Sequence, residues 1–185
     1  MKNNYGLLHA ARTNNIDLVR KLISDKTNLD IREPIGSTLK IIEEDDCPDL
    51  IKDFIRTNNC FDGCTALMWA SLMNYISMVE MLLEAGANPD IQDNDGAIAL
   101  IFATYMNNIE VVRMLISAGA DVDILHKDGF SAAMLASFKN NIPMLEIFLS
   151  SGANTTFVDA DGKNIFTITN DPTTIAFLQK MIVDD

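Results

Sequence analysis

The fold is decided by residues 62–127, which read DGCTALMWASLMNYISMVEMLLEAGANPDIQDN (62–94) and then DGAIALIFATYMNNIEVVRMLISAGADVDILHK (95–127). Both segments begin with Asp-Gly, and both carry Ala-Gly-Ala after an apolar run. The opening dipeptide occurs again at Asp128-Gly129 and Asp161-Gly162, so it recurs every 33 residues. A fixed period of this length predicts stacked structural repeats.

Each 33-residue unit contains apolar residues at helical spacing in its second half. Ile76, Val79 and Leu82 of one unit correspond to Ile109, Val112 and Leu115 of the next. This spacing predicts an amphipathic helix. Glycines follow it in three units and are expected to end it as C-cap residues: Gly86, Gly119 and Gly152.

Two further positions in the unit carry structural expectations. An asparagine, which tolerates the left-handed conformation, stands between the two expected helices at Asn14, Asn74, Asn107 and Asn140. A small residue in the first helix should let neighbouring units stack closely, and it is Ala70, Ala103 and Ala136.

The unit DG-x-T-A-L-M-x-A, a helix and then LL-x-A-G-A-N-x-D resembles the ankyrin repeat. The resemblance implies an all-α solenoid of about five stacked helix-turn-helix units with hairpin fingers. The chain departs from the family's T-P-L-H tetrapeptide, since it reads Thr65-Ala66-Leu67-Met68, Ile98-Ala99-Leu100-Ile101 and Ser131-Ala132-Ala133-Met134. We therefore expect apolar packing to replace much of the family's Thr-to-His hydrogen bonding between repeats.

A single solenoid domain is expected over residues 1–185. Repeat one covers 3–33, and a finger insertion follows it at 34–61. The stretch from Ala10 aligns with the stretch from Ala70, and this offset of 60 residues exceeds one 33-residue period by 27. Helical spacing after Pro48 predicts a short helix there. The other repeats are 62–94, 95–127 and 128–160, and residues 161–185 form a C-terminal capping repeat.

The charge balance narrows the classes of partner. The chain has 14 Lys and Arg against 26 Asp and Glu, a formal net charge of −12, so it should repel nucleic acid and anionic membranes. We expect a cytoplasmic protein, because no membrane-spanning run or secretory signal is visible. An odd set of three cysteines fits a reducing compartment.

Catalytic chemistry has little support in the sequence. The only histidines, His9 and His126, lie in different repeats, and no nucleophile elbow, phosphate loop or zinc-protease motif occurs. We expect no catalytic residue, no metal and no cofactor. An alternative stays open: Cys47, Cys60 and Cys64 could gather at a metal, which would make the insertion part of a metal-dependent regulator or enzyme.

An apolar stripe is expected on the concave face. The residues that end each first helix are usually polar in ankyrin-like repeats, whereas five of six are apolar in the three central units. Two questions stay open. The residues three positions before these apolar pairs either extend the stripe or are buried between repeats. The insertion either covers the stripe or leaves it exposed. The candidate partner-binding residues on this face are Trp69, Leu72, Met73, Phe102, Tyr105, Met106, Phe138 and Lys139.

The hairpin fingers supply a second candidate surface, and its charge is mainly negative. Its predicted residues are Asp62, Asn94, Asp95, Lys127, Asp128, Phe130, Asp159 and Asp161. We expect a protein partner with a basic or apolar contact surface, since opposite charge steers association. The sharper hypothesis is an inhibitor or immunity protein that occludes a basic partner; the alternative is an adaptor or a secreted effector that docks a host protein.

Overall fold

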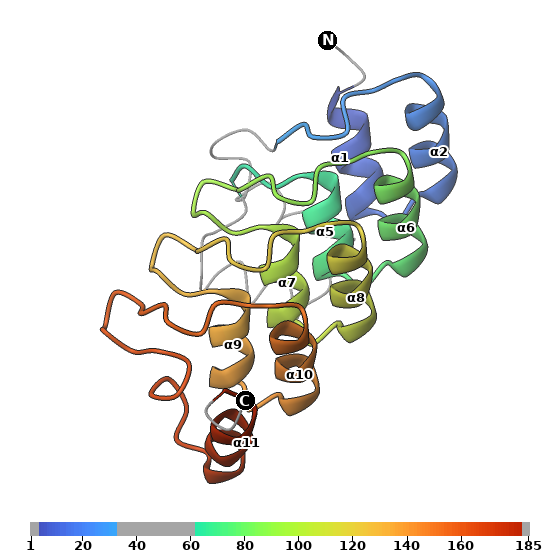
Figure 1. The fold of residues 1–185 in the computed structure, drawn as a ribbon. Coiled ribbons are helices and arrows are strands. Elements are labelled where there is room, and N and C mark those ends of the chain that lie inside the picture. Colours follow the sequence, from blue (N-terminus) through green and yellow to red (C-terminus); the bar gives the residue numbers. More distant parts are fainter. Residues whose placement is uncertain (1–3, 33–61, 183–185) are drawn as a thin grey trace.

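The computed structural model describes residues 4–32 and 62–182, which form helices joined by loops, with no strand among them (Figure 1). None of these helices is long and apolar enough to cross a bilayer. The finger insertion, including the helix predicted after Pro48, lies outside the described residues. The helices are α1 (Asn4–Arg12), α2 (Ile16–Ser24), α5 (Ala66–Leu72), α6 (Ile76–Glu84), α7 (Ala99–Tyr105), α8 (Ile109–Ser117), α9 (Ala132–Phe138), α10 (Ile142–Ser150) and α11 (Pro172–Ile182).

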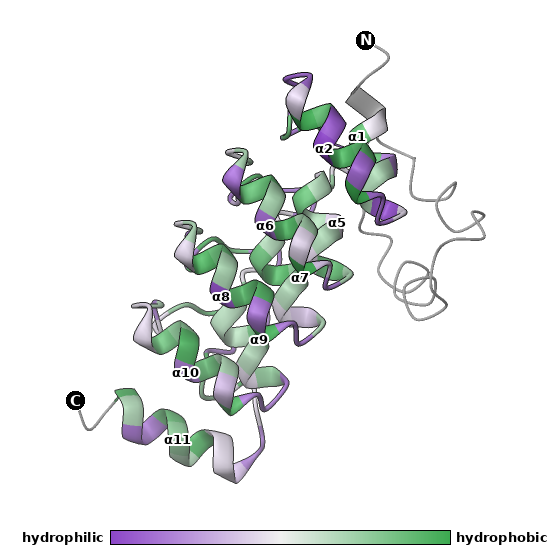
Figure 2. Ribbon diagram, turned by 90° about the vertical axis from the view of Figure 1, so that its right-hand side faces the viewer, coloured by the Kyte–Doolittle hydropathy of each residue, from purple (hydrophilic) through white to green (hydrophobic). Residues whose placement is uncertain are grey.

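The helices stack in two rows (Figures 1 and 2). The first helices of the repeats, α1, α5, α7 and α9, form an inner row, and α2, α6, α8 and α10 form an outer row. Each inner helix packs on its equivalent in the next repeat, as α7 does on α5 and α9. Loops project beyond the inner row as fingers, at the left of Figure 1. The predicted all-α repeat solenoid is confirmed.

Small side chains separate neighbouring inner helices. Ala70, Ala103 and Ala136 are all fully buried, at 0 % exposure. A larger side chain at these positions would push two helices apart, because protein interiors are close-packed. The burial of these alanines agrees with their predicted role in stacking, which stays a prediction.

The backbone at the helix ends follows the sequence expectations. The four asparagines between paired helices all have positive φ, from 52° at Asn14 to 61° at Asn107. Gly119 has φ +89° and follows α8. Its N–H donates to the carbonyl of Ile116, and the Ala120 N–H donates to that of Leu115, which is the Schellman arrangement.

Backbone hydrogen bonds join successive fingers. The N–H groups of Asn94, Lys127 and Ala160 donate to the carbonyls of Asp62, Asp95 and Asp128 at 3.1, 2.8 and 2.8 Å. Aspartates at the base of the fingers also accept an N–H from the following repeat. The pairs are Asp30 with Asn88, Asp90 with Asp121, and Asp123 with Asn154. These periodic bonds add to the apolar packing that we expected to join the repeats.

The last unit has one helix where a repeat would have two. A turn occupies residues 164–168, and only α11 follows it. The Asn164 side chain accepts hydrogen bonds from the N–H groups of Phe166 and Thr167, both at 3.0 Å. Such local bonds compete with helix formation. Ile165 is fully buried all the same, and its carbonyl accepts a bond from the Ser137 hydroxyl.

Two glycine substitutions test how closely the fingers pack. Gly119 and Gly129 both have positive φ, so alanine at either should lower the free energy of unfolding by about 1–2 kcal/mol. At Gly129, the added Cβ would also lie 3.2 Å from the Val158 carbonyl oxygen and from Asp159 Cα. At Gly119 it meets nothing within 4 Å. Urea unfolding should show a larger loss for Gly129→Ala; equal losses would contradict the close finger contact.

Candidate functional site

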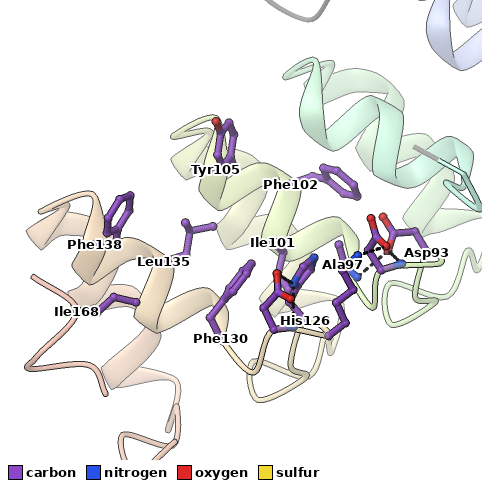
Figure 3. A pocket seen from close by; sticks show the side chains of 13 residues that line it. Asp93, Ala97, Ile101, Phe102, Tyr105, His126, Phe130, Leu135, Phe138 and Ile168 are labelled. Carbon is purple, nitrogen blue, oxygen red and sulfur yellow. Dashed lines mark hydrogen bonds and ion pairs between the residues drawn. The ribbon is translucent and has the colours of Figure 1, made fainter. Parts of the chain in front are cut away.

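A groove of about 390 Å³ lies between the inner helices and the fingers (Figure 3). Helices α7 and α9 form one wall, two consecutive fingers form the other, and the last unit contributes one residue. Its lining joins the two surfaces predicted separately from the sequence. The lining residues are Asp93, Asp95, Ala97, Ile101, Phe102, Tyr105, His126, Lys127, Asp128, Phe130, Leu135, Phe138 and Ile168.

The helix side of the groove is aromatic and open to solvent. Phe138 is 61 % exposed and Tyr105 is 37 % exposed, and both stand on the inner helices beside Leu135 in Figure 3. Phe130 approaches the same space from a finger. The Lys139 ammonium lies 4.4 Å from the centre of the Tyr105 ring. Tyr105 and Phe138 are thus exposed at the predicted place, and Lys139 borders them.

The predicted stripe does not extend to α5. Leu72 is only 1 % exposed, so the expectation that it faces solvent is wrong; α5 packs between α1 and α7, and all its residues are buried. Trp69 and Phe102, each 3 % exposed, are buried between repeats, although Phe102 still lines the groove. Met73 and Met106 are half-buried against the core.

The predicted finger residues divide into two groups. Asp95, Lys127, Asp128 and Phe130 line the groove, whereas the other four do not. Asn94 accepts a hydrogen bond from Arg32 at 2.8 Å through its side-chain oxygen. Asp159 accepts bonds from the N–H groups of Asp161 and Lys163. Asp62 is half-buried, and Asp161 is exposed.

Asp93 was missed by the sequence analysis. Its Oδ1 accepts the N–H groups of Asp95 at 2.9 Å and Ala97 at 2.8 Å. Its Oδ2 is buried without a hydrogen-bond partner among the described residues. Burial raises the pKa of this carboxyl from 3.8 to about 6, despite the two backbone hydrogen bonds that oppose the change.

His126 occupies the position of Asp93 in the next repeat, and Asp159 occupies it in the one after. The His126 ring stacks on Phe130, with 4.4 Å between centroids, and its Nδ1 accepts the Asp128 N–H at 3.2 Å. Burial lowers the pKa of His126 although two carboxylates oppose the change. The ring is therefore neutral at pH 7. Asp93 and His126 each stand two positions before an Asp-Gly dipeptide, and this common position in the repeat is the signal in the sequence that marks both residues.

On the finger wall, one aspartate forms an ion pair with a lysine, whereas another contacts only a histidine. Lys127 lies 2.7 Å from Asp95, and this hydrogen bond raises the pKa of the lysine ammonium. Asp128 lies 3.3 Å from His126 Nδ1, a contact that is attractive only when the imidazole is protonated. The groove thus presents three carboxylates and one ammonium.

The groove combines aromatic, aliphatic and carboxylate side chains, which are groups that can contact an apolar or a basic ligand. No group of three or more His, Cys, Asp or Glu is placed to hold a metal ion in residues 4–32 and 62–182. Of the cysteines in the metal hypothesis, Cys64 is buried in the core at 1 % exposure, and Cys47 and Cys60 lie outside those ranges. The described groove lining contains no serine, threonine or cysteine side chain.

Asp93→Asn tests the buried carboxyl. Because the folded state raises the pKa of Asp93, it favours the protonated form, and this group's contribution to stability improves as pH falls from 7 toward 4. The free energy of unfolding of the wild type, measured relative to Asp93→Asn, should rise by about 2 kcal/mol between pH 7 and pH 4.5. Urea titrations of both proteins at the two pH values measure it. A difference that does not change with pH would contradict the raised pKa.

Comparison with known proteins agrees with this architecture. A family model described as Ankyrin repeats (3 copies) matches residues 2–93 and 85–159. A search of curated proteins finds no significant match. The matched segments span most of the solenoid, including both walls of the groove except Ile168. The chain therefore belongs to the ankyrin repeat family.

Proposed function

We propose that this chain binds a protein partner in the groove between α7, α9 and the fingers. Ankyrin repeats are protein–protein interaction modules, and the family is typically non-enzymatic. The observation that carries the choice of surface is the exposed pair Tyr105 and Phe138 inside a groove with acidic residues on its other wall. Contiguous exposed apolar surface usually marks a site of interaction.

The energetics of this surface favour an anchoring role. A fully buried large apolar side chain contributes about 1.5–3 kcal/mol to association, before the entropic cost of binding is subtracted. Aromatic residues in a concave site are frequent hot spots of interfaces. Tyr105 and Phe138 stand at the ends of helices, so the backbone that carries them is already ordered before a partner covers them.

The acidic character of the chain supports a basic or apolar partner. The net charge is −12, and Asp95 and Asp128 stand at the groove wall. The net negative charge of the chain would attract a positively charged partner from beyond the groove. This attraction raises the association rate. A domain that covers the active surface of such a partner would act by occlusion, so our sharper proposal is an inhibitor or immunity protein.

A paired set of variants tests the proposed surface. The double variant Tyr105→Ser/Phe138→Ser removes the two exposed aromatic rings, and Ile76→Ser removes an exposed apolar side chain of α6 that does not line the groove. Affinity purification with quantitative mass spectrometry should recover a partner with the wild type and Ile76→Ser. Recovery by the double variant should fall at least tenfold, as expected for a loss of about 1.4 kcal/mol or more.

Thermal unfolding of the wild type and both variants checks that the changed proteins are folded. All three proteins should show similar thermal unfolding midpoints, since the changed side chains are exposed. A folded double variant that recovers the same partners as the wild type would contradict the groove as the binding surface. Activity assays of the recovered partner, with and without the chain, distinguish an inhibitor from an adaptor or effector.

A further inference from the structure

We propose that the finger end of the groove is a subsite for an arginine or lysine side chain of the partner, next to the aromatic wall that takes an apolar neighbour. This inference rests on the proposed function and adds the chemistry of the recognised segment. The partner would then present a short segment in which a basic residue stands close to an apolar one.

The first support is a pair of carboxylates without a cationic partner. Within the described ranges, neither Asp93 nor Asp128 forms an ion pair with lysine or arginine. The two cations nearby are already engaged: Lys127 contacts Asp95 at 2.7 Å, and Arg32 donates to the Gly63 carbonyl at 3.0 Å and to Asn94 at 2.8 Å. Arg32 and Lys127 act on these two carboxylates only at longer range, so an incoming cation would meet carboxylates that no lysine or arginine of the described residues contacts directly.

The second support is the buried state of Asp93. This side chain is only 5 % exposed, lines the groove and keeps Oδ2 without a hydrogen bond (Figure 3). An isolated carboxylate in such a place is costly, and a nearby positive charge reduces that cost. A cation held at Asp128 would act on Asp93 through space, without having to reach its covered oxygen.

The equivalent positions of the next finger show why the subsite lies here. Asp161 corresponds to Asp128, but Asp161 does not line the groove. Asp159 corresponds to His126 and uses its Oδ1 for two backbone N–H groups. Because His126 is a neutral ring stacked on Phe130, it adds a flat surface to the groove without adding a competing positive charge at pH 7.

The same groups give the subsite a direction of pH dependence. The charged groups that act on Asp93 are Asp95, Arg32 and Lys127, and those that act on His126 are Asp128, Asp95 and Lys127. As pH falls from 7.5 to 5.5, Asp93 gains a proton and His126 moves toward its protonated form. Both changes add positive charge, so affinity for a cationic segment should fall.

Selection from a phage-displayed library of random linear dodecapeptides tests the chemistry without a known partner. Clones that bind the wild type but not the Tyr105→Ser/Phe138→Ser variant are sequenced and made as fluorescent peptides. We expect arginine or lysine beside an aromatic or aliphatic residue. Replacing that basic residue by glutamine should weaken binding about tenfold, and so should Asp128→Asn in the protein.

Matched controls make the test specific. Asp161→Asn removes the equivalent charge of the next finger and should leave affinity within twofold of the wild type. The peptide change combined with Asp128→Asn should weaken binding no more than either alone, because both remove the same interaction. Asp93→Asn should reduce the loss of affinity between pH 7.5 and 5.5.

The outcomes separate the two proposals. Peptides that depend on Tyr105 and Phe138 but carry no basic residue, or whose basic residue is additive with Asp128→Asn, would overturn the subsite and leave the groove as the binding surface. A library in which no clone distinguishes the wild type from the folded aromatic double variant would count against both proposals.

Discussion

The rest of the molecule depends on the packing of the inner helices against one another, and these helices bury the small side chains of Ala70, Ala103 and Ala136. Because these side chains are small and fully buried, each inner helix lies directly against the next. That spacing brings the fingers within reach of one another, so that Lys127 N–H can meet the Asp95 carbonyl at 2.8 Å. The groove walls are therefore positioned by packing that occurs outside the groove.

A repeated scaffold makes departures from the repeat informative. The position of Asp93 and Asp159 normally serves the finger itself, since both carboxylates accept two backbone N–H groups. At His126, the ring accepts one such bond and stacks on Phe130 instead. His126 thus accepts one hydrogen bond fewer from the finger backbone than the aspartates do, and its ring forms a flat, half-buried surface next to solvent. This replacement occurs in one of the two fingers that line the groove, and the ring lies among the three aspartates of the lining.

The sequence alone predicted those features that depend on one repeat or on its nearest neighbour. The left-handed asparagines, the glycine helix ends and the buried alanines follow from local conformation and from the period. It failed for Leu72, because alignment places a residue within the repeat but does not reveal what surrounds it. Asp93 was overlooked for a related reason: the repeat register marks its position, but its burial and its oxygen without a partner are not visible in a one-dimensional pattern.

The turn at residues 164–168 has a consequence for the shape of any ligand. A full helix there would form the next member of the inner row and would flank α9, as α9 flanks α7. With a turn in its place, Phe138 is considerably more exposed than Tyr105, its equivalent one repeat earlier. At this end, the groove is therefore bordered by Ile168 of the turn and not by a further inner helix. A ligand that covers both Tyr105 and Phe138 would meet the side of this turn beyond Phe138, where a complete repeat would present another helix.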